Sequence, residues 1–174
     1  MIVDVIEDAW SAVAAQFGDG EVDRRAVYPL VQPEIKGVAG QSSMFVFPAA
    51  VWSVTREGPA EDSRDSSGRE RQFTDIQMDF RIDGPERKLT LGQELSGYRA
   101  VAMMAKLFIA VLASPGDYFE PEKSKESIDR IMNHRLVSWQ YLPDNFGIEL
   151  VLATVGSNFQ ARRVLALTLA GSVC

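Results

Sequence analysis

The stretch TLGQELSGYRAVAMMAKLFIAVLAS, residues 90–114, decides how the rest of this chain folds. It is the longest apolar run, and its apolar residues recur with the spacing of an α-helix. These residues are Leu95, Tyr98, Val101, Ala102, Ala105, Phe108, Ile109 and Leu112. Only Arg99 and Lys106 mark a polar stripe, so we expect a central helix that a sheet covers on most sides.

Both ends of this helix carry sequence signals. Thr90 and Gln93 have the spacing of a capping box, which predicts that Thr90 is the N-cap. Ser114 precedes Pro115, and the residue before a proline disfavours helical backbone, so the helix should end there. The helix then separates two strand-rich halves of the chain.

The sequence before the central helix predicts one helix and three strands. Residues 2–17 place apolar side chains on one helical face and acids on the other. Residues 25–32 fit a short edge strand between prolines. Residues 44–56 fit a long buried strand, in which Pro48 indicates an edge or a bulge. Residues 72–83 alternate apolar and polar side chains, which is typical of a strand with one buried face.

The segment between the last two strands, EGPAEDSRDSSGRER at 57–71, is strongly polar. It has five acids, three arginines and no apolar residue larger than alanine, so it cannot bury enough surface to order itself. We therefore expect a long mobile hairpin tip that contacts a neighbouring subunit. The candidate contact residues are Glu61, Asp62, Arg64, Asp65 and Arg69.

The second half predicts a helix and a hairpin. Residues 122–133 fit a short helix with three apolar anchors: Ile128, Ile131 and Met132. Residues 135–142 and 148–155 fit two strands joined by the loop PDNFG. The aromatic residues of these and earlier strands, without a basic patch beside them, fit strand core better than a base-stacking platform. They are Trp52, Trp139, Tyr141 and Phe146.

The tail over 160–171 is open to two interpretations. Leucines at every second position favour a strand: Leu165, Leu167 and Leu169. Ser157 as a cap and Gly171 as a stop would favour a helix. The alternation makes a strand the preferred prediction.

The tail also carries the only cysteine and, within its final predicted strand, one basic doublet. Arg162 and Arg163 stand in a stretch without acids from Gly156 onward, and they are a candidate patch for an acidic partner. Cys174 excludes an internal disulfide and a thiolate zinc site, because it has no second cysteine. We expect a free thiol, with an intermolecular disulfide as the alternative.

The bulk composition fits one domain over residues 1–174. We expect the α+β class: a mostly antiparallel sheet of long strands packed on the central helix, with an N-terminal amphipathic helix. A net charge of −6 opposes tight binding to nucleic acid, which depends on Lys and Arg at phosphates. The apolar run 100–113 is too short to span a bilayer and contains Lys106, and the first residues lack a signal peptide's basic region, so no membrane association is expected.

A search for catalytic and metal-binding patterns finds none. His134 has no second histidine to form a metal site, and it fits the polar end of a short helix. Nucleophile-elbow, dinucleotide and phosphate-loop motifs are missing from the sequence. We therefore expect no cofactor and no enzymatic activity.

Three aspartates on the alternating strand form a carboxylate row: Asp75, Asp79 and Asp83. Four strand positions span about 13 Å, so these carboxylates cannot share one ion. A solvated outer face is the simpler interpretation of the row.

The order of elements is an N-terminal helix, two long strands around a polar segment, a central helix, and a final hairpin or three strands. In this order, and in its size and acidity, the chain resembles the tail-terminator (tail-completion) proteins of long-tailed bacteriophages. The resemblance implies a homohexameric ring that caps the tail tube and joins it to the head-neck connector. It also implies assembly in the host cytoplasm and a place in the virion, at the tail-neck junction. Another phage neck or tail protein, or a small-molecule-binding or enzyme domain without a recognisable motif, are the alternatives.

A ring on a DNA conduit gives the carboxylate row a second interpretation. DNA would pass through the lumen without tight binding, and carboxylates would repel its phosphates. Asp75, Asp79 and Asp83, partly offset by Arg81, are the candidate lining.

Overall fold

The computed structural model describes residues 2–30, 45–64, 70–82, 87–143 and 147–155. In chain order, the elements are α1 (Ile2–Ala15), β1 (Val27–Pro29), β2 (Ala49–Arg64), β3 (Glu70–Arg81), β4 (Leu89–Thr90), β5 (Glu94–Leu95), α2 (Gly97–Ala113), the 3₁₀ turn η3 (Pro115–Asp117), α3 (Lys125–Asn133), β6 (His134–Tyr141) and β7 (Gly147–Val155). The α+β class predicted from the sequence is confirmed.

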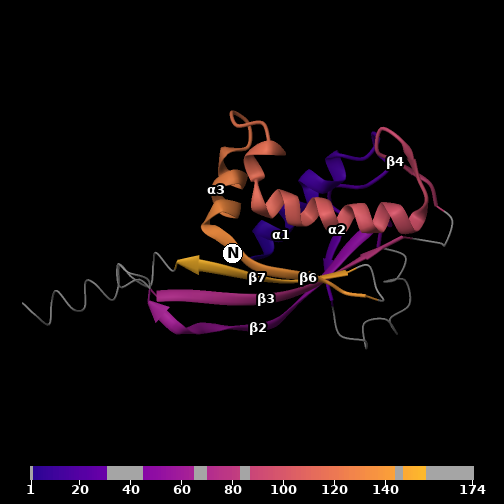
Figure 1. Ribbon diagram of the computed structural model, residues 1–174. Coiled ribbons are helices and arrows are strands. Elements are labelled where there is room, and N and C mark those ends of the chain that lie inside the picture. Colours follow the sequence, from indigo (N-terminus) through magenta and orange to yellow (C-terminus); the bar gives the residue numbers. More distant parts are fainter. Residues whose placement is uncertain (1, 31–44, 65–69, 83–86, 144–146, 156–174) are drawn as a thin grey trace, which may run out of the picture.

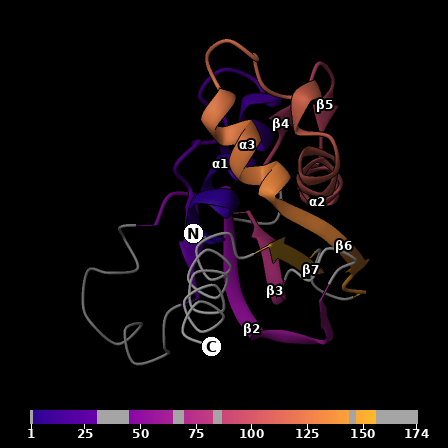
Figure 2. The same cartoon turned by 90° about the vertical axis from the view of Figure 1, so that its left-hand side faces the viewer.

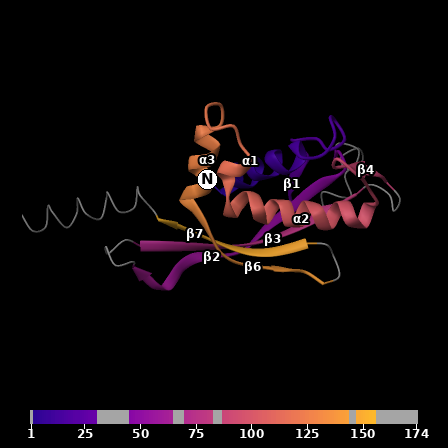
Figure 3. The same ribbon diagram turned by 45° about the horizontal axis from the view of Figure 1, so that its top comes forward.

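The main sheet has the strand order β1-β2-β3-β7-β6. Its short first strand is parallel to β2, and every other pairing is antiparallel, as the sequence predicted. The helices lie together on one face of this sheet, and none of them lies on the opposite face (Figures 1 and 2). The long strands β2 and β3 continue beyond the end of α3 (Figures 1 and 3).

The core lies between the sheet and the helices. Phe108 of α2 is fully buried, and its ring centroid is 5.9 Å from that of Phe80 on β3. Trp10 of α1 also packs against Phe80, with ring centroids 6.0 Å apart. Trp10 Nε1 also donates a hydrogen bond to the Asp23 carbonyl, which satisfies its one polar atom. The packing of α2 on the sheet is therefore confirmed, but the prediction that the sheet covers it on most sides is wrong. The sheet lies on one side of α2, and α1 packs beside it on the same face.

The predicted start of the central helix is wrong. The helix begins at Gly97 after Ser96, and Thr90 lies in β4, which pairs with β5 in a small hairpin. The Thr90 amide donates to the Glu21 carboxylate at 2.5 Å, and the Thr90 carbonyl accepts from the Gly18 amide at 2.8 Å. Because its backbone amide and carbonyl bond to this distant segment, Thr90 does not cap the helix.

Burial along the central helix follows its predicted faces with a few differences. Arg99 and Lys106 are exposed, as expected. Tyr98 is 67% exposed, and Leu95 and Ala102 are only half-buried, because the helix begins later and the sheet covers one side of it. The remaining apolar positions predicted for the core are buried: Val101, Ala105, Phe108, Ile109 and Leu112.

The prediction of a loop over 57–71 is wrong for most of its residues. The strand β2 begins at Ala49, later than predicted, and runs on to Arg64, while β3 begins at Glu70. Glu57, Gly58 and Pro59 pair with β3, and Arg64 pairs with Glu70. Backbone pairing orders this polar segment, which needs no apolar burial of its own to form strand. Residues 65–69 lie outside the described residues.

The other predicted elements are confirmed, with three corrections to burial. Residues 25–32 contribute the edge strand β1, and β6 and β7 form the predicted hairpin. Met132 is 66% exposed, so Ile131 is the buried anchor of α3. Trp139 and Tyr141, expected in the core, are 47% and 45% exposed because β6 is the last strand of the sheet. Residues 156–174 and Phe146 lie outside the described residues.

Candidate functional site

The side chains of β3 alternate between the face of the sheet that packs on the helices and the opposite face. Its even positions are buried against the helices: Thr74, Ile76, Met78 and Phe80. Its odd positions therefore point to the opposite face, where no described helix covers them. We call this surface the open face. It holds Asp75 and Asp79, so the predicted orientation of these two aspartates is confirmed.

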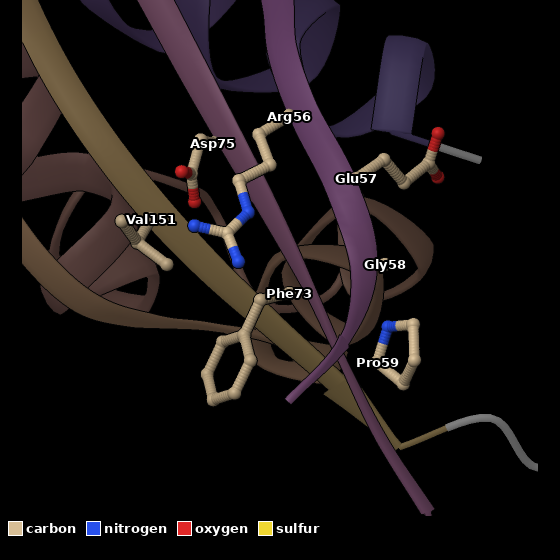
Figure 4. Close-up of a pocket in the computed structure, with 7 residues that line it drawn as sticks. All are labelled: Arg56, Glu57, Gly58, Pro59, Phe73, Asp75 and Val151. Carbon is tan, nitrogen blue, oxygen red and sulfur yellow. The ribbon is translucent and has the colours of Figure 1, made fainter. Parts of the chain in front are cut away.

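A hollow of about 540 Å³ lies on the open face where β2, β3 and β7 meet (Figure 4). It is lined by Arg56, Glu57, Gly58, Pro59, Phe73, Asp75 and Val151. Gly58 lies opposite Phe73 in the β2–β3 register. A Cβ added at Gly58 would meet no atom within 4 Å, so the missing side chain leaves this hollow open beside the Phe73 ring.

A bulge in β2 decides which charges face each other in this hollow. The register shifts between Val54 and Arg56, so Arg56 lies directly opposite Asp75. In Figure 4 the Arg56 side chain extends over the hollow on the same side as Asp75 and Phe73. Strict alternation would not place this arginine on the open face, which is why sequence reasoning missed it.

Asp79 is more buried than a solvated strand residue. Its side chain is 22% exposed, and one carboxylate oxygen lies 3.7 Å from the Arg81 guanidinium. The other oxygen, Oδ1, is buried and has no hydrogen-bond partner among the described residues. Gly147 lies opposite on β7, and a Cβ there would lie 2.7 Å from this oxygen and 2.5 Å from the Met78 carbonyl. Glycine therefore leaves room for the Asp79 side chain between the strands.

The predicted acidic row is thus part of a mixed surface. On the open face, Asp75 lies opposite Arg56 in the strand register, and Asp79 lies 3.7 Å from the Arg81 guanidinium. Glu149 of β7 accepts a hydrogen bond from the Gln140 side chain. The third aspartate of the row, Asp83, lies outside the described residues.

The outer edge of β6 is an apolar feature that sequence reasoning missed. Three apolar side chains along this strand are about half exposed: Val137 at 51%, Trp139 at 47% and Tyr141 at 45%. The last two rings contact each other edge to face, with centroids 5.0 Å apart. In the described part of the chain β6 pairs only with β7, so the backbone groups along its other side form an open edge.

The remaining predicted contact residues are only partly placed. Glu61, Asp62 and Arg64 lie on the far part of β2. Asp65, Arg69, Arg162 and Arg163 lie outside the described residues.

His134 has the structural role that the sequence suggested. It follows α3 directly, and its Nδ1 lies 2.8 Å from the Arg130 carbonyl oxygen. Burial lowers the pKa of this imidazole, which favours its neutral form. Across residues 2–155 with the gaps given above, no group of three or more His, Cys, Asp or Glu side chains is arranged to hold a metal ion.

A second hollow, of about 440 Å³, lies between α1 and the segment before α3. Near it, Arg130 of α3 donates to the Asp8 carboxylate at 2.8 Å and holds α3 against α1. On the surface here, Lys123 pairs with Glu120 at 3.2 Å. Of these two ion pairs, Arg130–Asp8 joins two helices, and Lys123–Glu120 is local to the segment before α3.

Among the described helices, none is long and apolar enough to cross a membrane. No model of a known protein family matches the chain, and no curated protein matches its sequence.

Proposed function

We propose that this protein is a structural subunit of a bacteriophage tail, a terminator-like ring component that caps the tail tube and joins it to the head-neck connector. The observation that carries the proposal is the open β6 edge. Among the described residues, one edge of β6 has no partner strand and carries half-exposed aromatic side chains. Such an edge is a template for another polypeptide and a liability when left bare. In an assembled ring, a neighbouring subunit would cover this edge, and the edge would then contribute to subunit contact.

The charges of the open face fit a conduit that DNA passes without binding. In a ring, this face is the candidate lining, because its mixed charges offer phosphates no cluster of cations. Arg56 lies opposite Asp75 in the register, Arg81 pairs with Asp79, and Glu149 adds a further carboxylate. Phosphate contacts from unmatched Lys or Arg would raise DNA affinity with each contact.

The test of this function is direct imaging of the purified protein. We expect negative-stain electron microscopy and mass photometry to find closed rings with a central channel, and six subunits is the expected number. Added to purified tail tubes, the protein should bind one end of each tube. A monomer or closed dimer that binds no tube would contradict the proposed function.

A further inference from the structure

We propose that the hollow between α1 and the segment before α3 is a binding site for a small hydroxyl-rich carboxylate of the sugar-acid class. Its volume of about 440 Å³ is within the range of small-molecule sites. Its lining comes from α1, Arg24 and residues between 118 and 127, all in the described part of the chain. These elements lie on the helix-covered side of the sheet, so the site does not depend on the ring (Figures 1 and 2).

The hollow exists because one stripe of α1 carries small side chains. Ser11, Ala12 and Ala15 follow one another at helical spacing and line one wall. The ion pair between Asp8 and Arg130, at 2.8 Å, joins α1 to α3 beside them. Small side chains between two elements that are tied together in this way leave a space.

Several hydroxyl groups line this space without a hydrogen-bond partner among the described residues. They belong to Ser11, Tyr118 and Ser124, which are all half-buried. Ser124 precedes α3, but its hydroxyl makes no capping bond. The Ser127 hydroxyl has one weak contact, 3.5 Å from an Arg130 nitrogen. Each hydroxyl can both donate and accept, so together they match a ligand that carries several hydroxyls of its own.

The charged side chains favour one negative group on this ligand. Asp8 uses its Oδ2 atom to pair with Arg130, and Glu120 uses its Oε2 atom to pair with Lys123. The second oxygen of each carboxylate can accept from a ligand hydroxyl. Arg24 has neither an ion pair nor a hydrogen bond within the described ranges. A guanidinium binds a planar carboxylate through two parallel hydrogen bonds, so Arg24 is the expected partner of the ligand carboxylate.

Two aromatic rings give the hollow an apolar surface. Tyr118 and Phe119 are half-buried, and they pack against the hydrophobic core while also lining the hollow. A sugar ring has C–H groups on its faces and hydroxyls around its rim. The aromatic rings can contact the C–H groups while the surrounding polar side chains bind the hydroxyls.

A phosphate group is the main alternative partner for Arg24, because guanidinium groups also bind phosphate. The formal charges of the lining cancel, since Arg24 and Lys123 are balanced by Asp8 and Glu120. Such a lining attracts a dianion less strongly than a cluster of cations would. A single carboxylate among neutral hydroxyls is therefore the better match.

Saturation-transfer NMR with the full chain tests the site, with glucuronate, galacturonate and mannuronate as probes. At least one of them should bind saturably, and the corresponding neutral sugar should bind about tenfold more weakly or not at all. Arg24→Gln should lower the affinity for the sugar acid by about tenfold. Arg25→Gln is the matched control, because Arg25 is the next residue, is also exposed and does not line the hollow. This control should bind as the wild type does.

A second pair of variants fills the hollow without changing its charge. Ala15→Leu enlarges a side chain that lines the hollow, whereas Gln16→Leu places the same leucine at the next position, outside the lining. Only Ala15→Leu should weaken binding. Both positions are exposed, so both variants should fold, as thermal melting would check.

Failure of all three sugar acids to bind saturably would overturn the site. Equal affinity in wild type and Arg24→Gln, or equal binding of a sugar acid and its neutral sugar, would overturn the proposed ligand class. Inorganic phosphate that displaces the sugar acid at a lower concentration than the sugar acid itself requires would do the same. Rings should form normally in Arg24→Gln, so loss of this site leaves the proposed function standing. Sugar-acid binding by a protein that forms no rings would leave the site standing instead.

Discussion

The two edges of the main sheet differ in how well they are protected against pairing with another strand. On one side β1 covers only Ala50–Trp52, and the rest of β2 is protected by a bulge, by the exposed charges of Arg56 and Glu57, and by Pro59. On the other side β6 presents half-exposed aromatic residues and no proline. One edge is therefore built to resist pairing, and the other is suited to accept it.

This difference assigns separate roles to the two sides. The protected β2 edge can be long and polar because nothing has to cover it. Among the described residues, the β6 edge leaves apolar side chains half-exposed, and an added strand would cover them. The predictions below test the parts of the structure that support each edge.

The largest effect is expected at the core that supports both edges. Phe108→Ala removes a fully buried ring of α2 that packs on β3, and it should lower the free energy of unfolding by about 3–5 kcal/mol. Chemical denaturation measures this, and repeating it at several protein concentrations separates folding from any linkage to assembly. Met132→Ala on the exposed face of α3 is the control and should change little. A loss below about 1 kcal/mol for Phe108→Ala would show that α2 is not the central support.

An intermediate effect on stability is expected from glycine-to-alanine substitutions, and it should differ between the two sides of the sheet. Gly147→Ala on β7, next to β6, would bring a Cβ within 2.5 Å of the Met78 carbonyl, and should destabilise the fold by about 1–3 kcal/mol. Gly58→Ala on β2 meets open space, so it should be neutral or slightly stabilising. Urea melts of both variants would measure the contrast. Equal effects would mean that β7 moves freely against β3, which would weaken the description of a rigid β6 side.

Sequence periodicity was enough to predict the α+β class and most strands. The alternation of β3 and the apolar spacing of α2 depend only on burial of one face, so they can be recognised without the structure. The start of α2 could not be predicted, because Glu21 and Gly18 take the backbone groups of Thr90 from far along the chain. The far part of β2 was missed because its composition is that of a solvated loop, while its order comes from pairing with β3.

The candidate site was predicted less well for a related reason. The orientation of Asp75 and Asp79 follows from alternation, but Arg56 reaches the same face only through a bulge. Trp139 and Tyr141 alternate as they would in a central strand, and the sequence does not reveal that β6 is the last strand. Strand order arises from contacts between distant segments, so edges are the part of a sheet that local patterns predict worst.

The smallest effect concerns Glu21, on the segment leading into β1 at the protected edge. Its carboxylate accepts hydrogen bonds from the Thr90 hydroxyl and amide, and these bonds hold the pKa of Glu21 below its usual value of 4.5. A carboxyl group with a lowered folded-state pKa adds stability above its unfolded pKa, and this stability is lost as pH falls through the folded-state pKa. The stability difference between wild type and Glu21→Gln should therefore be present at pH 7 and shrink as the pH drops below about 4.5. Thr90→Val, which removes the hydroxyl that contributes most to the shift, should reduce the same difference at pH 7. A difference that stays constant from pH 7 to pH 3 would show that the Glu21 carboxylate does not stabilise this edge.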